Sequence, residues 1–329
     1  MMLRSATIAV TAFLLTLTLA AQRPQGHRHP DMGNVPAVFL KAVRNANTLR
    51  YSGERVVEFQ RGPNRKVHIE YVMRDGQNSR VTFPDDSDFA GQIIVENSQE
   101  RLHYFPKRNE IEVLPTKRED AFIRLKIWVG HKNQTRLSSA RGEPVAGRAT
   151  EVGIVADQNG NVVQRLWVDS QTGLVLKREL LDAGGARMGA YEFRQVDYNP
   201  VIHPGDFTIV HRGAVRVTLA DRVTRVAREH KMAVVMLPPN SGFTLDSVNF
   251  RQVAGKEVMH ESYTASRGRL SLFQVAGVAD LSGFQRRGEH ELQFYGWVMN
   301  GRSFALVGNS SLADLRRLAR TLGDPGTAL

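Results

Sequence analysis

The sequence "RLWVDSQTGLVLKRELLDAGG", residues Arg165–Gly185, decides the fold. Its charged and apolar residues alternate with a period near two, which is typical of a half-buried strand and too short for a helix. Gly173 follows Asp169-Ser170-Gln171-Thr172 and suits the left-handed position of a tight turn. The stretch therefore predicts an antiparallel ribbon of two strands.

The ribbon is expected to have one apolar and one polar face. A second turn at residues 183–186 returns the chain along residues 190–196, giving a curved sheet whose apolar side must be covered by helices or by a ligand. We predict ligand contact at the apolar face, and the alternative is a sheet filled by its own helices. The apolar face comprises Leu166, Val168, Leu174, Leu176 and Leu180, and the polar face comprises Arg165, Trp167, Asp169, Lys177 and Glu179.

The rest of the first half predicts helices packed on an antiparallel meander. Apolar residues repeat at helical spacing after Asn34, a suitable N-cap, and again within residues 119–132. Short segments rich in Val, Ile, Tyr and Phe alternate with Gly, Pro, Asn and Asp. The predicted strands are residues 51–60, 66–73, 79–83, 92–96, 101–105, 110–114, 143–156, 162–169, 174–181 and 190–196.

The second half predicts a smaller α+β domain. Residues 208–231 form a basic, helix-like linker, and residues 232–323 contain predicted strands at 257–264, 270–275, 291–298 and 302–308. Ser311 is placed to cap a terminal helix with Leu312, Leu315 and Leu318 at helical spacing. The predicted domains are a first domain at 34–207, this linker, a second domain at 232–323 and a tail at 324–329.

The N-terminus has the pattern of a secretory leader. Arg4 precedes an apolar run over residues 6–19, and Ala20 and Ala21 provide small residues for cleavage. We therefore predict a cleaved signal peptide at residues 1–21, a flexible lead-in at 22–33 and a periplasmic or otherwise extracytoplasmic location, and the alternative is an uncleaved anchor. The absence of cysteine fits export.

The composition favours polyanionic partners. Lys and Arg number 44 and Asp and Glu number 33 in the 329 residues, a net charge of +11. Such a charge attracts nucleic acid, anionic lipid or acidic polymers, and export excludes nucleic acid. Small basic clusters that could contact an acidic partner are Arg286, Arg287, Arg316, Arg317 and Arg320.

Catalytic and metal-binding patterns are missing from the sequence. It has no G-x-S-x-G, H-E-x-x-H or phosphate-binding loop. Asp85, Asp86 and Asp88 lack the glycine and distal glutamate of a calcium loop, and His27 and His29 lie in the lead-in. We therefore expect a binding protein with no catalytic residue, no metal and no cofactor.

Several segments together resemble a known family. "YSGERVVEF" (residues 51–59), "GQIIVENSQERLHYFPKRNEIEV" (91–113), the ribbon and "FRQVDYNPVIHPGDF" (193–207) resemble the N-terminal domain of the MucB/RseB sigma-E factor regulatory proteins. That domain is similar to LolA-type lipoprotein carriers. "LPPNSGFTLDSV" (237–248), "LSLFQV" (270–275) and the terminal helix resemble the family's C-terminal domain.

The resemblance implies a fold and a function. The fold is mainly β, a LolA-like half-open antiparallel β-barrel with covering helices, followed by a smaller α+β domain. The function is binding of the extracytoplasmic part of a membrane anti-sigma factor, with release when a lipid, lipopolysaccharide or lipoprotein acyl group occupies a hydrophobic cavity. The alternatives are a periplasmic carrier of lipoproteins or lipids and a ligand-free envelope scaffold; a homodimer is a further option.

Overall fold

The computed structural model describes residues 35–61, 64–116, 135–253, 255–265, 268–279 and 292–326. They form two compact units, residues 35–97 with 135–208 and residues 98–116 with 209–326. The predicted leader, lead-in, helix at 119–132, Arg286 and Arg287 lie outside the described residues. The domain boundaries drawn from the sequence remain a prediction.

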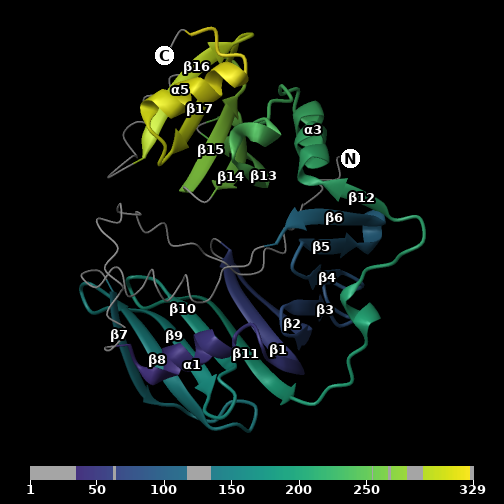
Figure 1. The fold of residues 1–329 in the computed structure, drawn as a ribbon, viewed down its shortest axis with the longest axis vertical. Coiled ribbons are helices and arrows are strands. Elements are labelled where there is room, and N and C mark those ends of the chain that lie inside the picture. The colour runs from purple at the N-terminus through teal and green to yellow at the C-terminus, as the bar shows by residue number, and fades with distance from the viewer. Residues whose placement is uncertain are drawn as a thin grey trace. The chain divides into compact units, whose positions relative to one another are not determined.

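The first unit is a long antiparallel sheet with one described α-helix. Its strands are hydrogen-bonded in the order β4-β3-β2-β1-β11-β10-β9-β8-β7 (Figure 1), and β4 and β7 do not pair with each other within the described part of the chain. The sheet is therefore half-open, as predicted. The elements are α1 (Ala37–Asn45), β1 (Arg50–Arg61), β2 (Asn64–Asp75), β3 (Asn78–Thr82), β4 (Ile93–Glu96), β7 (Thr135–Arg141), β8 (Thr150–Asp157), β9 (Val162–Asp169), β10 (Val175–Leu181), β11 (Arg187–Asp197) and η3 (Pro204–Phe207).

The predicted ribbon is present as β9 and β10. Gly173 has φ +80° and Gly185 has φ +82°, so both turns use the left-handed conformation that favours glycine. The predicted strand over residues 143–156 begins only at Thr150, because residues 143–149 form a tight loop closed by the Val145–Arg148 bridge. β7 lies in a stretch for which the sequence predicted no strand.

Helix α1 packs on the sheet as its spacing predicts. It runs from Ala37 to Asn45, and Pro36 takes the N-cap position that the sequence predicts for Asn34. Val38 and Phe39 are each 2% exposed and join Val155, Leu166 and Val168 in one core cluster. The helix therefore covers part of the apolar face of β8 and β9.

The second unit contains a five-stranded antiparallel sheet in the order β13-β14-β15-β17-β16, and three further strands in which β12 pairs in parallel with β6 and β6 pairs with β5. Its core gathers Trp297, Phe304, Leu306 and Leu315. The elements are β5 (Glu100–Phe105), η2 (Pro106–Arg108), β6 (Glu110–Pro115), β12 (Val215–Thr218), α3 (Leu219–Glu229), η4 (Pro239–Ser241), β13 (Thr244–Val253), β14 (Lys256–Ala265), β15 (Gly268–Val275), β16 (Gln293–Met299), β17 (Arg302–Gly308) and α5 (Leu312–Thr321).

The linker predicted at residues 208–231 contains β12 and helix α3. Thr218 and Asp221 form a capping box at the start of this helix. Val223 and Ala227 are fully buried against Val248 and Met259 of the five-stranded sheet. This segment is thus part of the second unit's core as well as a connection.

Candidate functional site

The five residues predicted to contact a ligand are all buried. Leu176 is 0% exposed and Val168 is 1% exposed. Leu166 and Val168 pack with α1, whereas Leu174 and Leu176 belong to a second cluster with Tyr51 and Phe193. Protein side chains already contact this surface, so its role in ligand binding stays a prediction.

The predicted separation of an apolar and a polar face is incomplete. Trp167, placed on the polar face by alternation, is 6% exposed and shares a cluster with Leu174 and Leu176. The pairing of β10 with β9 shifts between Val175 and Lys177, a bulge that interrupts the period of two. Leu176 of β10, at the bulge, therefore lies in the cluster of Trp167 and not with Leu166 and Val168, so the five residues predicted to share the apolar face belong to different clusters.

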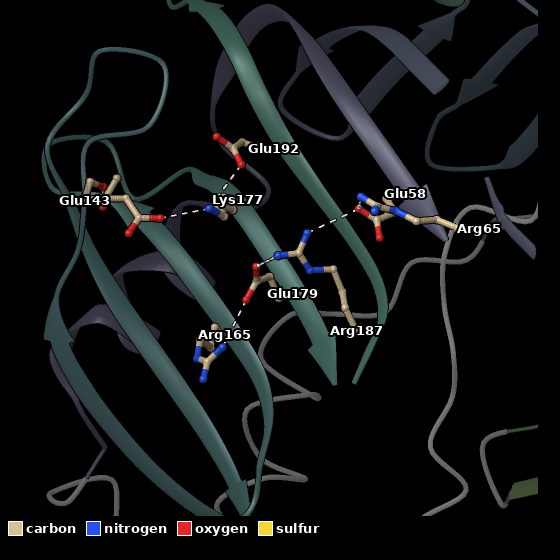
Figure 2. Close-up of polar contacts among 9 residues, drawn as sticks. Glu58, Arg65, Glu143, Arg165, Lys177, Glu179, Arg187 and Glu192 are labelled. Atoms are coloured by element: carbon tan, nitrogen blue, oxygen red, sulfur yellow. Dashed lines mark hydrogen bonds and ion pairs between the residues drawn. The ribbon is translucent and has the colours of Figure 1, made fainter. Parts of the chain in front are cut away.

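The charged members of the polar face form ion pairs across the sheet (Figure 2). Glu179 binds Arg165 at 3.3 Å and Arg187 at 2.7 Å, and Arg187 continues to Glu58 at 3.4 Å. Lys177 binds Glu143 at 3.0 Å and lies 4.6 Å from the ring centre of Trp167. These cations already have partners, so this face is a structural network.

A buried charged row lies on β1 and β2. Glu70 accepts from Arg55 Nε at 2.8 Å and lies 2.9 Å from His68 Nε2. Burial alone would raise the pKa of Glu70, but the charge of Arg55 and the contact with His68 outweigh it and lower the pKa to about 2. Phe83 and Phe89 pack against the His68 ring. Arg55 and Glu70 therefore form an ionised pair, and the two phenylalanine rings pack against the neighbouring His68.

A pocket of about 460 Å³ opens on β1, β2, β3 and β11. It is separate from the five predicted apolar residues. The chain that follows β11 runs beside β3 (Figure 1), held there by Arg80, whose Nη1 donates to the carbonyl oxygens of Asp206 at 2.9 Å and Thr208 at 3.1 Å. The lining residues are Ser52, Gly53, Tyr71, Val72, Met73, Arg80, Thr82, Gln195, Val196 and Asp197.

Arg80 is not among the site residues that the sequence predicts. It is the one charged residue of β3, in the sequence NSRVT, and among the described residues it makes no ion pair. Burial lowers its pKa, with Asp206 acting in the opposite direction. A lone basic residue in an otherwise neutral strand was the available signal, but only the fold shows that it faces a pocket.

The arginines predicted on the terminal helix are exposed. Leu315, Leu318 and Ala319 of α5 are buried, whereas Arg316, Arg317 and Arg320 point away from the core. Arg317 pairs with Asp314 at 2.6 Å, and the Arg316 guanidinium lies 5.8 Å from the Tyr295 ring centre. The helix therefore presents a basic outer face.

Glu261 is a buried acid in the second unit. It is 1% exposed and accepts a hydrogen bond from the Tyr263 hydroxyl, which in turn accepts from the backbone N–H of Leu237. Burial raises the pKa of Glu261 to about 7, although the Tyr263 hydrogen bond acts to lower it.

The described residues contain no group of three or more His, Cys, Asp or Glu arranged to hold a metal ion. No described helix combines the length and apolar character that a membrane crossing requires.

No protein-family model and no curated protein matches the sequence. Solved structures similar to it include MucB in complex with MucA(peri), 17% identical, covering 86% of this chain and 96% of that one with a TM-score of 0.43. A chain of the Pseudomonas aeruginosa MucA/MucB complex is 17% identical, and the match covers 86% of this chain and 96% of that one with a TM-score of 0.41. The LolA superfamily protein NE2245 from Nitrosomonas europaea is 11% identical over 84% and 92%, with a TM-score of 0.24. At these identities the likeness concerns the fold alone.

Proposed function

We propose that this chain is an extracytoplasmic binding protein that binds the periplasmic part of a membrane anti-sigma factor and thereby modulates an envelope-stress response. The segments that resemble the MucB/RseB family support this partner, since they lie on the strands and turns of a half-open sheet and a second β unit. MucB itself has been solved in complex with MucA(peri).

The observation that carries the proposal is the basic outer face of α5. Arg316, Arg317 and Arg320 are exposed on one short helix, and Arg317 pairs with Asp314, the acidic residue of that helix. Guanidinium groups recognise carboxylates through paired hydrogen bonds. An acidic segment of the partner would complement this face.

The test is capture of the tagged mature protein from gently cross-linked envelopes, with identification of bound proteins and extracted lipids. We expect recovery of a single-span protein with a cytoplasmic sigma-binding segment. The variant with Arg316, Arg317 and Arg320 changed to Gln should recover at least tenfold less of this partner protein. Each exposed charged contact contributes up to about 1 kcal/mol to binding.

A matched control carries the same change at three exposed arginines of the first unit, Arg136, Arg141 and Arg194. It should recover the partner normally. Equal loss in both variants would assign the effect to net charge and overturn the role of α5, and recovery of no such partner from the unmodified protein would overturn the proposed function.

Ligand sensing is the second part of the proposal. A lipid or acyl group can release the partner only if it prefers the unbound conformation or an overlapping surface. Addition of the extracted lipids should therefore lower the recovery of the partner. If the captured protein instead carries acylated cargo in a constant molar ratio and no signalling partner, the carrier alternative is favoured.

A further inference from the structure

The pocket on β1, β2, β3 and β11 contains two opposite charges without an ion pair. Arg80 lies at one end and Asp197 at the other, and neither makes an ion pair among the described residues. The register connects Asp197 to Ser52, Ser52 to Met73 and Met73 to Arg80. Residues directly opposite share a face of the sheet, and three strand spacings separate the two ends by roughly 14 Å.

Backbone hydrogen bonds hold the guanidinium of Arg80 through Nη1, and its Nε–Nη2 edge makes no hydrogen bond within the described chain. Nη1 donates to both backbone carbonyls of the segment after β11. Nε and Nη2 have no hydrogen-bond partner within the described chain. Their two parallel N–H groups match the spacing of the two oxygens of a carboxylate. The backbone thus holds the side chain in place for a bidentate anion.

The rest of the lining suits an extended polar chain with an apolar side group. The hydroxyls of Ser52, Tyr71 and Thr82 and the amide of Gln195 make no side-chain hydrogen bond among the described residues, and Met73 adds apolar surface. A volume of about 460 Å³ lies within the range of small-molecule sites.

The charge balance favours a carboxylate over a phosphate. Arg80 is the one cation of the lining and Asp197 its one anion, so the charges of the lining cancel, and Asp206 outside the lining also acts on Arg80. A phosphate monoester carries about −1.5 to −2 charges near neutral pH, which one arginine beside an aspartate does not balance. A single carboxylate carries one negative charge, which matches the one positive charge of Arg80.

We propose that this pocket binds the C-terminal end of a short peptide. The terminal carboxylate binds the Nε–Nη2 edge of Arg80, the last side chain packs on Met73, and the amino end lies toward Asp197. The site is distinct from the proposed partner surface on α5, and its occupancy is measurable without any partner.

Calorimetric titration with three tripeptides tests the ligand class. Ala-Leu-Phe with free ends should bind with one-to-one stoichiometry, and its C-terminal amide should bind at least tenfold more weakly, because a charge-assisted bidentate contact is lost. The acetylated peptide should also bind more weakly. Equal affinity of the amide would overturn the proposal, equal affinity of the acetylated peptide would overturn the assignment of Asp197, and tighter binding of octyl phosphate would identify a phosphate site instead.

Variants test whether Arg80 binds the terminal carboxylate. Arg80→Lys keeps the charge and loses the planar fork, so the preference for the free carboxylate over the amide should fall at least tenfold. Arg194→Gln changes an exposed arginine of β11 outside the lining and should leave the preference unchanged. If Arg80→Lys retains the full preference, the pocket assignment is wrong.

Discussion

Glu261 shows how one buried side chain couples the stability of the second unit to pH. Its folded pKa of about 7 lies above the ordinary value of 4.5. The folded state therefore holds the proton more tightly than the unfolded state. Its contribution to the free energy of unfolding is fully present below pH 4.5 and is lost as the pH rises through 7.

We predict that Glu261→Gln removes this pH dependence. The native chain should lose on the order of 3 kcal/mol between pH 4.5 and pH 8 from this residue, at 1.36 kcal/mol for each pKa unit. The variant should be the more stable protein at pH 8, as measured by urea unfolding. Glu257→Gln, at a more exposed position on the same strand, is the control. If the free energy of unfolding of the native and Glu261→Gln proteins changes with pH in parallel, the prediction is refuted.

Leu176 tests whether the predicted ligand surface is core. Its side chain is fully buried beside Tyr51 and Phe193. Leu176→Asp places a charge there, and burial of an unpaired carboxylate costs several kcal/mol. We expect loss of cooperative unfolding in the first unit, seen by circular dichroism. A folded Leu176→Asp protein that had lost acyl binding would instead support a ligand cavity.

At the scale of elements, helix α1 depends on a glycine in the strand beneath it. A Cβ added at Gly153 would lie 2.9 Å from the Phe39 ring, closer than real Cβ contacts. Phe39 is 2% exposed and packs with Leu166 and Val168. The close approach of helix to sheet therefore requires a residue without a side chain at this point.

We predict that Gly153→Ala destabilises the first unit by about 1–3 kcal/mol through overpacking. Combination with Phe39→Leu should recover part of the loss, because the smaller side chain makes room. Gly205→Ala, where an added Cβ meets no atom within 4 Å, should be close to neutral. Thermal unfolding of the four proteins measures the effect, and equal midpoints for the Gly153 and Gly205 variants would contradict it.

At the scale of the whole molecule, we expect the net charge of +11 to affect the rate of association with an acidic partner. Opposite charge speeds the encounter of partners, and salt screens it over a length of about 8 Å at physiological ionic strength. We predict that binding of the captured anti-sigma segment slows as salt increases from 50 to roughly 300 mM. The α5 variant should show a flatter salt dependence than the Arg136, Arg141 and Arg194 control, measured by stopped-flow fluorescence; equal slopes would remove α5 from the encounter surface.

Much of the architecture was determined by the sequence alone. The alternation in residues 165–181, the left-handed glycine at 173, the turn at 183–186, the Ser311 cap and the helical spacing of α5 are local patterns, and each formed the predicted element. Local patterns are readable because backbone geometry fixes a period of two or 3.6 residues. Short turns between strands account for the antiparallel pairing, whereas the half-open form of the sheet was implied by the resemblance to the MucB/RseB family.

Whether a side chain faces solvent, protein or a pocket depends on the tertiary structure. The bulge between Val175 and Lys177, the burial of Trp167 and the placement of Arg80 beside the segment after β11 depend on contacts between residues far apart in sequence. Arg80 and Asp206 are separated by 126 positions. No local period encodes such a contact, because it arises when distant strands pair and the chain after them packs across the sheet.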